Sequence, residues 1–123
     1  AFRLDLSRER APRRKAVLAK KGNTMAAYFI AQYVVKDPAL YGEYQQGAGP
    51  TIAASGAELI SFDIAAETVE GTPPGPQTVI IKFEDADAAK AWYNSPEYQA
   101  VVGKRLAATE GYAIISQTMN VGG

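Results

Sequence analysis

The sequence contains neither cysteine nor histidine. Without cysteine, the chain has no disulfide, no thiolate nucleophile and no cysteine-based metal site. Without histidine, it lacks the commonest general base and the usual ligand of haem and zinc. Any acid–base chemistry must therefore use Asp, Glu, Tyr or Lys, and we expect neither a metal nor another cofactor. The lack of cysteine also fits a reducing cytoplasm, which is the location that we expect.

Long apolar runs are absent too. None approaches the roughly 20 residues that a membrane-spanning helix needs, so we expect no membrane association. The chain also lacks a phosphate loop, a dinucleotide fingerprint and a cluster of acidic residues suited to Mg²⁺. What it does contain is 123 residues, of which 47% are hydrophobic. That is enough for one domain with a single hydrophobic core.

The net charge of zero conceals a division of the chain. Residues 1–24 hold eight Lys or Arg and two acidic residues, a net charge of +6, so residues 25–123 carry −6. We interpret residues 1–24 as a basic N-terminal extension outside the domain, and residues 25–123 as the domain. Nucleic-acid binding through the basic arm is the alternative role. The acidic body makes nucleic acid an unlikely main partner.

The first half of the domain predicts a strand followed by a helix. Residues 27–35 are rich in aromatic and β-branched side chains, which are typical of a strand. Asp37-Pro38 supplies an N-cap and a proline at the first helical position, and Ser55-Gly56 supplies the end of that helix. Pro50 lies inside it, so we expect a kink or a break there.

The second half predicts two strands, a broken helix and a last strand. Residues 58–64 and 78–83 alternate in polarity and are joined by a Gly/Pro-rich connector. This alternation places Ile60, Phe62 and Ile64 on one face, and on the other Leu59, Ser61, Asp63, Thr78, Ile80 and Lys82. Asp85 and Ser95-Pro96 each begin a helix. Gly111 is expected to precede the last strand, at residues 112–121.

This order of elements predicts an α+β fold of the ferredoxin-like type, βαββαβ, with a four-stranded antiparallel sheet. Helices then cover one face of the sheet and leave the other face open. The open face is wide and partly apolar, which indicates that a second sheet covers it. We therefore expect a homodimer.

A resemblance to a known family rests mainly on residues 91–99, Ala-Trp-Tyr-Asn-Ser-Pro-Glu-Tyr-Gln. Supporting features are Asp37-Pro38 with Tyr41 and Tyr44, Pro50, and Val69-Glu70-Gly71. On these residues the body, about residues 26–121, resembles the domain of unknown function 1330 family of the dimeric α/β-barrel superfamily. The resemblance implies two domains that pair their sheets into a barrel. The superfamily includes cofactor-free monooxygenases, muconolactone-type isomerases and haem enzymes, but the likeness implies no particular reaction.

The expected ligand site is a cleft between the sheet and the helices, lined by aromatic side chains. Arg105 is the most unusual candidate, because it shares an apolar helical stripe with Tyr98. It is either an anion receptor or a structural cation, paired with a carboxylate or extended to the stripe's edge. The carboxylates considered as its partner are Asp63, Glu70 and Glu110.

The other candidate ligand-binding residues are aromatic or lie at a helix junction: Tyr41, Tyr44, Trp92, Asn94, Ser95 and Tyr98. The aromatic rings stack on a flat ligand or pack in the core or at a dimer interface. The phenols of Tyr41 and Tyr44 orient a ligand or form structural hydrogen bonds. Asn94 and Ser95 hold an anion on exposed N–H groups or simply cap the helices.

The candidate catalytic residues are Asp63 and Glu70 as bases, with Glu67 beside them, and Arg105 as a stabiliser of an oxyanion. The alternative is that these acids are solvated residues of a hairpin. The sequence therefore predicts a small homodimeric domain that binds a small organic molecule, anionic or aromatic. Cofactor-free isomerase or monooxygenase-like chemistry is one use of that site, and non-catalytic binding or regulation is the other.

Overall fold

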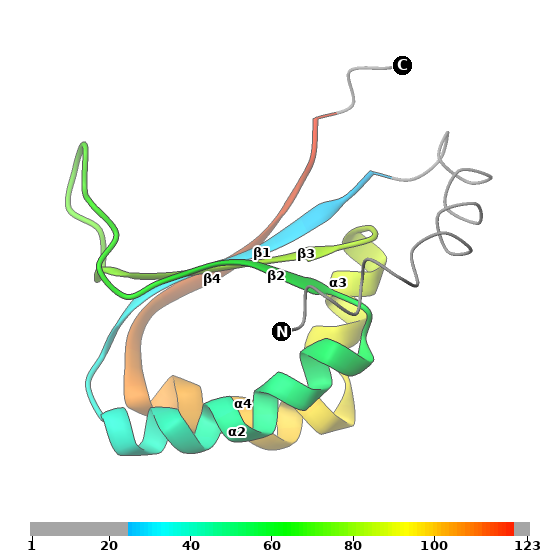
Figure 1. Cartoon of the computed structure of the whole chain (residues 1–123), viewed down its shortest axis with the longest axis horizontal. Coiled ribbons are helices and arrows are strands. Elements are labelled where there is room, and N and C mark those ends of the chain that lie inside the picture. Colours follow the sequence, from blue (N-terminus) through cyan, green and yellow to red (C-terminus); the bar gives the residue numbers. More distant parts are fainter. Residues whose placement is uncertain (1–24, 120–123) are drawn as a thin grey trace.

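The computed structural model describes residues 25–119, which form four strands and three helices in the order βαββααβ (Figure 1). Their bounds are β1 Ala27–Val35, α2 Pro38–Ala54, β2 Glu58–Asp63, β3 Gln77–Phe83, α3 Ala86–Tyr93, α4 Pro96–Ala108 and β4 Thr109–Gln117. The predicted strand at 27–35 and the broken helix between the last two strands are confirmed. The proposed basic extension, residues 1–24, lies outside the described residues.

The four strands form one antiparallel sheet in the order β2-β3-β1-β4. All three helices lie on the same side of this sheet (Figure 1). The predicted ferredoxin-like arrangement is therefore confirmed. Alternate side chains of β1 point to the helices, and Phe29 and Tyr33 are buried there together with Val79 and Ile81 of the neighbouring β3.

The predicted faces of β2 are wrong in one respect. A bulge between Leu59 and Ser61 breaks the alternation, so Leu59 pairs with Ile81 and Phe62 pairs with Val79. Both partners face the helices, and Leu59 packs against the core. A bulge adds one residue to a strand, and every later side chain then changes face relative to simple alternation.

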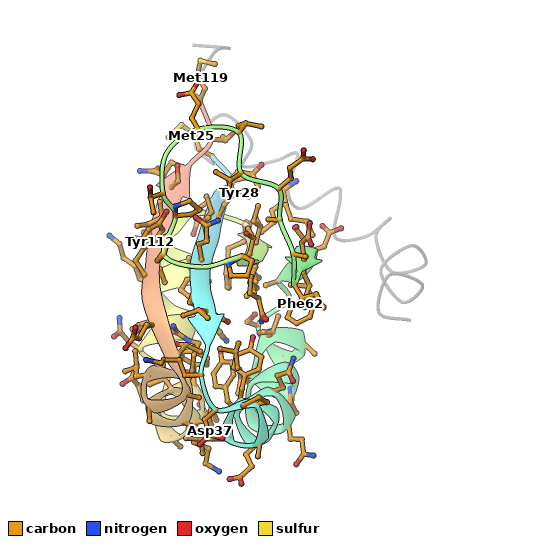
Figure 2. All side chains as sticks on the ribbon, turned by 90° about the vertical axis from the view of Figure 1, so that its left-hand side faces the viewer. Met25, Tyr28, Asp37, Phe62, Tyr112 and Met119 are labelled. Carbon is orange, nitrogen blue, oxygen red and sulfur yellow. The ribbon has the colours of Figure 1, made fainter. Side chains whose placement is uncertain are left out.

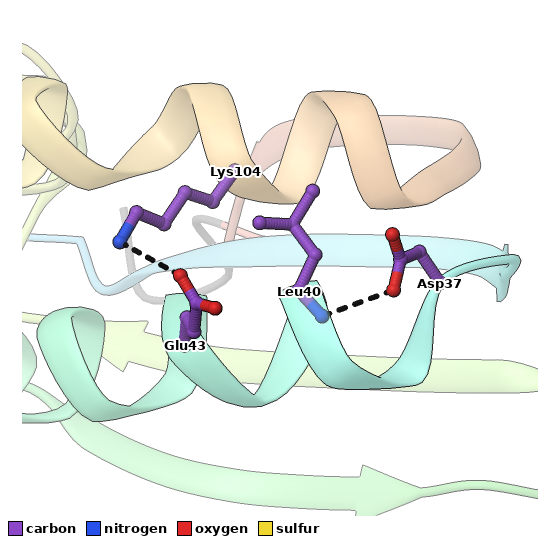
Figure 3. A network of polar contacts seen from close by, with 4 residues as sticks. All are labelled: Asp37, Leu40, Glu43 and Lys104. Carbon is purple, nitrogen blue, oxygen red and sulfur yellow. Dashed lines mark hydrogen bonds and ion pairs between the residues drawn. The ribbon is translucent and has the colours of Figure 1, made fainter.

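Short polar side chains begin each helix, as the sequence predicts. Asp37, Asp85 and Ser95 accept hydrogen bonds from the backbone of the first turns of α2, α3 and α4. Figure 3 shows the Asp37 cap, whose Oδ1 accepts from the Leu40 amide at 3.1 Å. Capping fixes where each helix starts, and therefore which of its residues face the sheet.

Helix α2 is not broken at Pro50. The helix is assigned continuously from Pro38 to Ala54, and its axis bends upward in its second half (Figure 1). The proline removes one backbone donor, which a bent helix tolerates at an exposed position. Lys104 of α4 reaches across to Glu43 of α2, with 3.3 Å between Nζ and Oε1 (Figure 3). The two helices therefore lie side by side below the sheet.

The last strand begins earlier than predicted, at Thr109, directly after α4. Gly111 lies inside it rather than before it, paired with Tyr33 of β1. A Cβ atom at Gly111 would overlap the backbone and side chain of Tyr33. Glycine is thus required here by the close approach of two strands, and not as the start of a strand. The end predicted for this strand, residue 121, lies outside the described residues.

No described element covers the sheet face opposite the helices. Tyr28 and Ile30 of β1 lie on this face with Ile80 of β3 and with Tyr112 and Ile114 of β4. Tyr112 and Ile114 are 49% and 50% exposed. In Figure 2, Tyr28 lies near the middle of the sheet and Tyr112 near its β4 edge. This open face is mixed, because Gln32 of β1 and Thr78 and Lys82 of β3 lie on it beside the apolar side chains.

Candidate functional site

A cavity of about 220 Å³ lies between α2 and the sheet, on the side of β2 and β3. Its wall is apolar apart from three tyrosines and one glutamine. The lining residues are Phe29, Tyr33, Tyr41, Tyr44, Gln45, Ala48, Gly49, Ile52, Leu59, Phe62, Val79 and Ile81. In Figure 2, Phe62 lies at the β2 edge of the molecule. The sequence analysis expects a cleft between the sheet and the helices, and Tyr41 and Tyr44 are among the residues that line this cavity.

The tyrosines of the cavity wall are joined by hydrogen bonds. The hydroxyls of Tyr33 and Tyr41 lie 2.8 Å apart, and the Tyr41 oxygen also accepts from Nε2 of Gln77 at 2.8 Å. A second pair joins Tyr44 on α2 to Tyr98 on α4, with 2.7 Å between their oxygens. Both pairs are buried. Four phenols therefore meet in the core beside the cavity.

Arg105 is buried among these tyrosines, with 4% of its surface exposed. Its guanidinium carbon lies 5.6 Å from the centre of the Tyr33 ring and 5.9 Å from that of Tyr44. Its Nε atom is buried without a hydrogen-bond partner. Arg105 does not line the cavity but contacts two residues that do.

None of the three carboxylates considered as partners forms an ion pair with Arg105. Glu110 pairs with Lys36 at 3.0 Å. Asp63 is exposed and accepts from the Ala65 amide at 2.9 Å, as in an ordinary turn. Glu70 is exposed in the connector between β2 and β3. Within residues 25–119, Arg105 is therefore not paired with a carboxylate, which is one of the structural roles that the sequence analysis considers for it.

Burial fixes the protonation of the cluster. It raises the pKa of Tyr33 and of Tyr44 well above the ordinary value, and raises the pKa of Tyr41 in the same direction. Burial alone lowers the pKa of Arg105, but Tyr98, Tyr44 and Tyr33 together outweigh it and the net direction is upward. At neutral pH Tyr33, Tyr41 and Tyr44 are therefore neutral phenols next to one guanidinium cation.

Trp92 and Tyr98 belong to the core and not to the cavity wall. Their ring centres lie 4.1 Å apart, and the Trp92 ring meets Phe29 edge-on at 5.2 Å. The indole Nε1 donates to Thr51 Oγ1 at 3.0 Å, which joins α3 to α2. These contacts account for the burial of Trp92 and hold α4 in the position that brings Arg105 to the tyrosines.

Asn94 and Ser95 occupy the junction between α3 and α4. The Asn94 side chain donates to the Lys90 carbonyl at 3.0 Å. Ser95 Oγ donates to the Trp92 carbonyl at 2.8 Å and accepts from the Tyr98 amide at 3.2 Å. Their side chains are thus engaged in capping, and neither lines the cavity.

The acidic candidates lie away from the cavity. Asp63, Glu67 and Glu70 are exposed at the end of β2 and in the connector that follows, and none lines the cavity. Within residues 25–119 no three Asp, Glu, His or Cys side chains gather as ligands for a metal ion. No helix in the same range is long and apolar enough to cross a membrane.

Tyr33 and Gln77 are site residues that the sequence analysis missed. They lie opposite each other on neighbouring strands, and both side chains are buried toward the helices. The alternation of side chains along β1 and β3 predicts that both residues face the helices. Residues 27, 29, 31 and 33 share one face, and so do 77, 79, 81 and 83. A tyrosine and a glutamine at the ends of two otherwise apolar rows indicate a polar end to the core.

Comparison with protein families gives one match. Residues 26–119 match the family described as Domain of unknown function (DUF1330). No protein with a curated function matches the chain.

Several solved structures share the fold at low sequence identity. A protein of unknown function from Rhodopseudomonas palustris is 17% identical with a TM-score of 0.65, over 86% of this chain and 94% of that one. SnoaB, a cofactor-independent oxygenase from Streptomyces nogalater, is 12% identical with a TM-score of 0.58, over 79% and 96%. A dimeric ferredoxin-like protein of unknown function from Thermobifida fusca is 16% identical with a TM-score of 0.52, over 80% and 93%.

Proposed function

Because the chain belongs to the DUF1330 family, whose description assigns no activity, we propose its function from the site itself: it binds a small organic molecule in the cavity between α2 and the sheet. The observation that carries this proposal is a cavity of about 220 Å³ whose largely apolar wall includes three buried tyrosines. Ligand sites typically combine an apolar wall with a few fixed polar groups. A cavity that binds no ligand would lower the stability of the protein without serving a function.

Ligand screening by thermal shift tests this proposal, because a molecule that binds only the folded state raises the melting temperature. The panel contains small aromatic and branched molecules, both neutral and charged. Ala48→Leu places extra atoms in the cavity from α2 and should abolish the shifts. Ala53→Leu, at an exposed position of the same helix, should keep them. If no member of the panel shifts the wild-type protein, the proposal is refuted.

We also propose that the protein is a homodimer whose copies pair through the open sheet face. Two observations support it: Tyr112 and Ile114 leave an apolar surface on that face, and a structural neighbour is described as dimeric. Light scattering should return twice the chain mass of 13.1 kDa at micromolar concentration. Ile114→Lys should lower it to one chain mass, because a charge on a covered apolar face opposes association. A wild-type protein of one chain mass would contradict the dimer.

If the protein is an enzyme, the site favours cofactor-free proton transfer or oxygenation. The phenols and Arg105 are suited to stabilising an oxyanion, and SnoaB is described as a cofactor-independent oxygenase. No carboxylate within residues 25–119 lines the cavity, so a tyrosine, or the substrate itself, would have to accept or donate the proton. The alternative is a binding or regulatory module. Incubation with a ligand found in the screen, followed by mass analysis, separates turnover from binding. Nucleic-acid binding through residues 1–24 is the least favoured function.

A further inference from the structure

We infer that the ligand of this cavity is a small monocarboxylate with an apolar body, whose carboxylate oxygens accept hydrogen bonds from the tyrosine hydroxyls next to Arg105. The inference rests on the proposed binding function and adds the charge class of the ligand. It follows from counting the donor hydrogens of the buried polar cluster against the acceptors available to them.

The first pair of phenols has one hydrogen more than it uses. Tyr33 and Tyr41 share a single hydrogen bond, so one hydroxyl hydrogen lies between the two oxygens. Gln77 donates to Tyr41 as well and takes up an acceptor site without using a hydroxyl hydrogen. Whichever phenol donates within the pair, the hydrogen of the other has no acceptor among the described residues.

The second pair repeats this imbalance. Tyr44 and Tyr98 share one hydrogen bond, so one hydroxyl hydrogen lies between their two oxygens. One hydroxyl hydrogen of this pair is therefore also left over. The Nε–H of Arg105 has no acceptor either. Nearly all buried polar groups in proteins find partners, so a cluster with three spare donors lacks an acceptor that binds from outside.

The charge of the cluster points the same way as its hydrogens. Arg105 is a buried cation with no carboxylate partner within residues 25–119. Glu43 is paired to Lys104 and Glu110 to Lys36. A water molecule can accept a spare hydrogen, but it leaves the cation without a counter-charge. An anionic oxygen satisfies both requirements, and carboxylates are strong acceptors from such donors.

The remaining lining residues of the cavity determine the size and polarity of the rest of the ligand. Away from the phenols the wall is formed by aliphatic and aromatic side chains: Ile52, Leu59, Phe62, Val79 and Ile81. Its volume of about 220 Å³ is below the roughly 300–1,000 Å³ of sites for drug-sized ligands. A single aromatic ring or a short branched chain next to the carboxylate fits this description. A phosphate or a sugar does not, because most of its polar surface would face apolar atoms.

Titration calorimetry with benzoate and benzamide tests the inference, because the two probes share shape but differ in charge. A unit charge on a ligand near a buried cation changes affinity by more than tenfold at a protein-like effective dielectric. We therefore expect the wild-type protein to bind benzoate at least tenfold more tightly than benzamide. Arg105→Met should remove this preference. Lys104→Met, which removes the neighbouring exposed cation of the same helix, should keep it.

Tyr44→Phe serves as a second variant if Arg105→Met does not fold, and it should weaken benzoate more than benzamide. Equal affinities in the wild-type protein, or a benzoate preference that Arg105→Met leaves intact, would overturn the inference. Binding of benzamide without binding of benzoate would overturn it too, while the proposed function survives. If neither probe nor any other molecule of the screening panel binds, both proposals fail.

Discussion

Replacing Arg105 by methionine should leave the ligand-free protein about as stable as the wild type. Burying the guanidinium costs several kcal/mol in lost hydration. Against this stand two contacts with aromatic rings, each on the order of 1–2 kcal/mol when desolvated. The neighbouring phenols also favour the charged form. These opposing contributions are of similar size, and no ion pair within residues 25–119 adds to the favourable side.

Methionine is apolar, unbranched and close to arginine in length, so it fills much of the same space without a charge. We expect the free energy of unfolding to change by less than about 1.5 kcal/mol, in either direction, because a buried cation is exchanged for packing. Guanidinium denaturation at a fixed protein concentration measures this, since association between copies would make stability depend on concentration. Lys104→Met is the matched control at an exposed position of the same helix.

A loss of about 3–5 kcal/mol in Arg105→Met would refute this reasoning, because that is the usual cost of breaking a buried ion pair. It would mean that a carboxylate partner is present in the folded chain, and Arg105 would then be a structural residue. The same result would remove the main argument for an anionic ligand. The stability of this one variant thus decides between the two interpretations that the sequence left open.

Three further predictions concern packing, pH and the N-terminus. Gly47→Ala should destabilise the protein by about 1–3 kcal/mol, because its Cβ would lie 2.5 Å from Val101 Cγ1. In a Val101→Ala background the same change should be neutral or stabilising by up to about 1 kcal/mol. Equal losses of stability in both backgrounds would contradict this prediction. Burial raises the pKa of the Tyr44 phenol, so its contribution to stability is complete below about pH 10, the pKa of tyrosine in the unfolded chain, and decreases at higher pH. Above that pH, the denaturant midpoint should fall less steeply with pH in Tyr44→Phe than in the wild type. The lysines titrate equally in both proteins and do not produce this difference. Deleting residues 1–24 should leave the melting temperature almost unchanged, and a large decrease would show that this segment docks on the domain.

Much of the fold could be predicted because its local signals agree with one another. Asp37, Asp85 and Ser95 are good N-caps, and proline follows two of them at the first helical position. The apolar alternation of β1 and β3 has the period of a strand with one buried face. Where such signals coincide, the sequence specifies both the type and the order of the elements.

The errors in the fold prediction come from contacts between strands. The bulge in β2 depends on its pairing with β3, and nothing in residues 58–64 announces the extra residue. Gly111 is predicted to precede the last strand, but it lies inside β4, where the close approach of Tyr33 from β1 requires a glycine. In both cases the deciding neighbour lies far away in the sequence, so local periodicity does not contain the information.

The site could be predicted only in part, for a related reason. Arg105 stands out in the sequence because a cation interrupts an apolar helical stripe, and Tyr41 and Tyr44 share a helix face. Whether Arg105 has a carboxylate partner depends on which side chains the sheet and α2 bring to it. The pairing of Tyr44 with Tyr98 joins residues 54 positions apart. Such a contact is determined by how α2 and α4 pack, and residue spacing alone does not reveal it.

The composition of the buried cluster is itself an argument for function. Phenylalanine at the positions of Tyr33 and Tyr44 would retain most of the packing and would remove hydroxyls that have no full set of partners. An apolar residue at position 105 would avoid the burial of a charge. A core selected for stability alone would favour these replacements, because single stabilising changes are easy to reach. That the chain instead keeps four phenols and a guanidinium beside a cavity points to a ligand that supplies the missing acceptor.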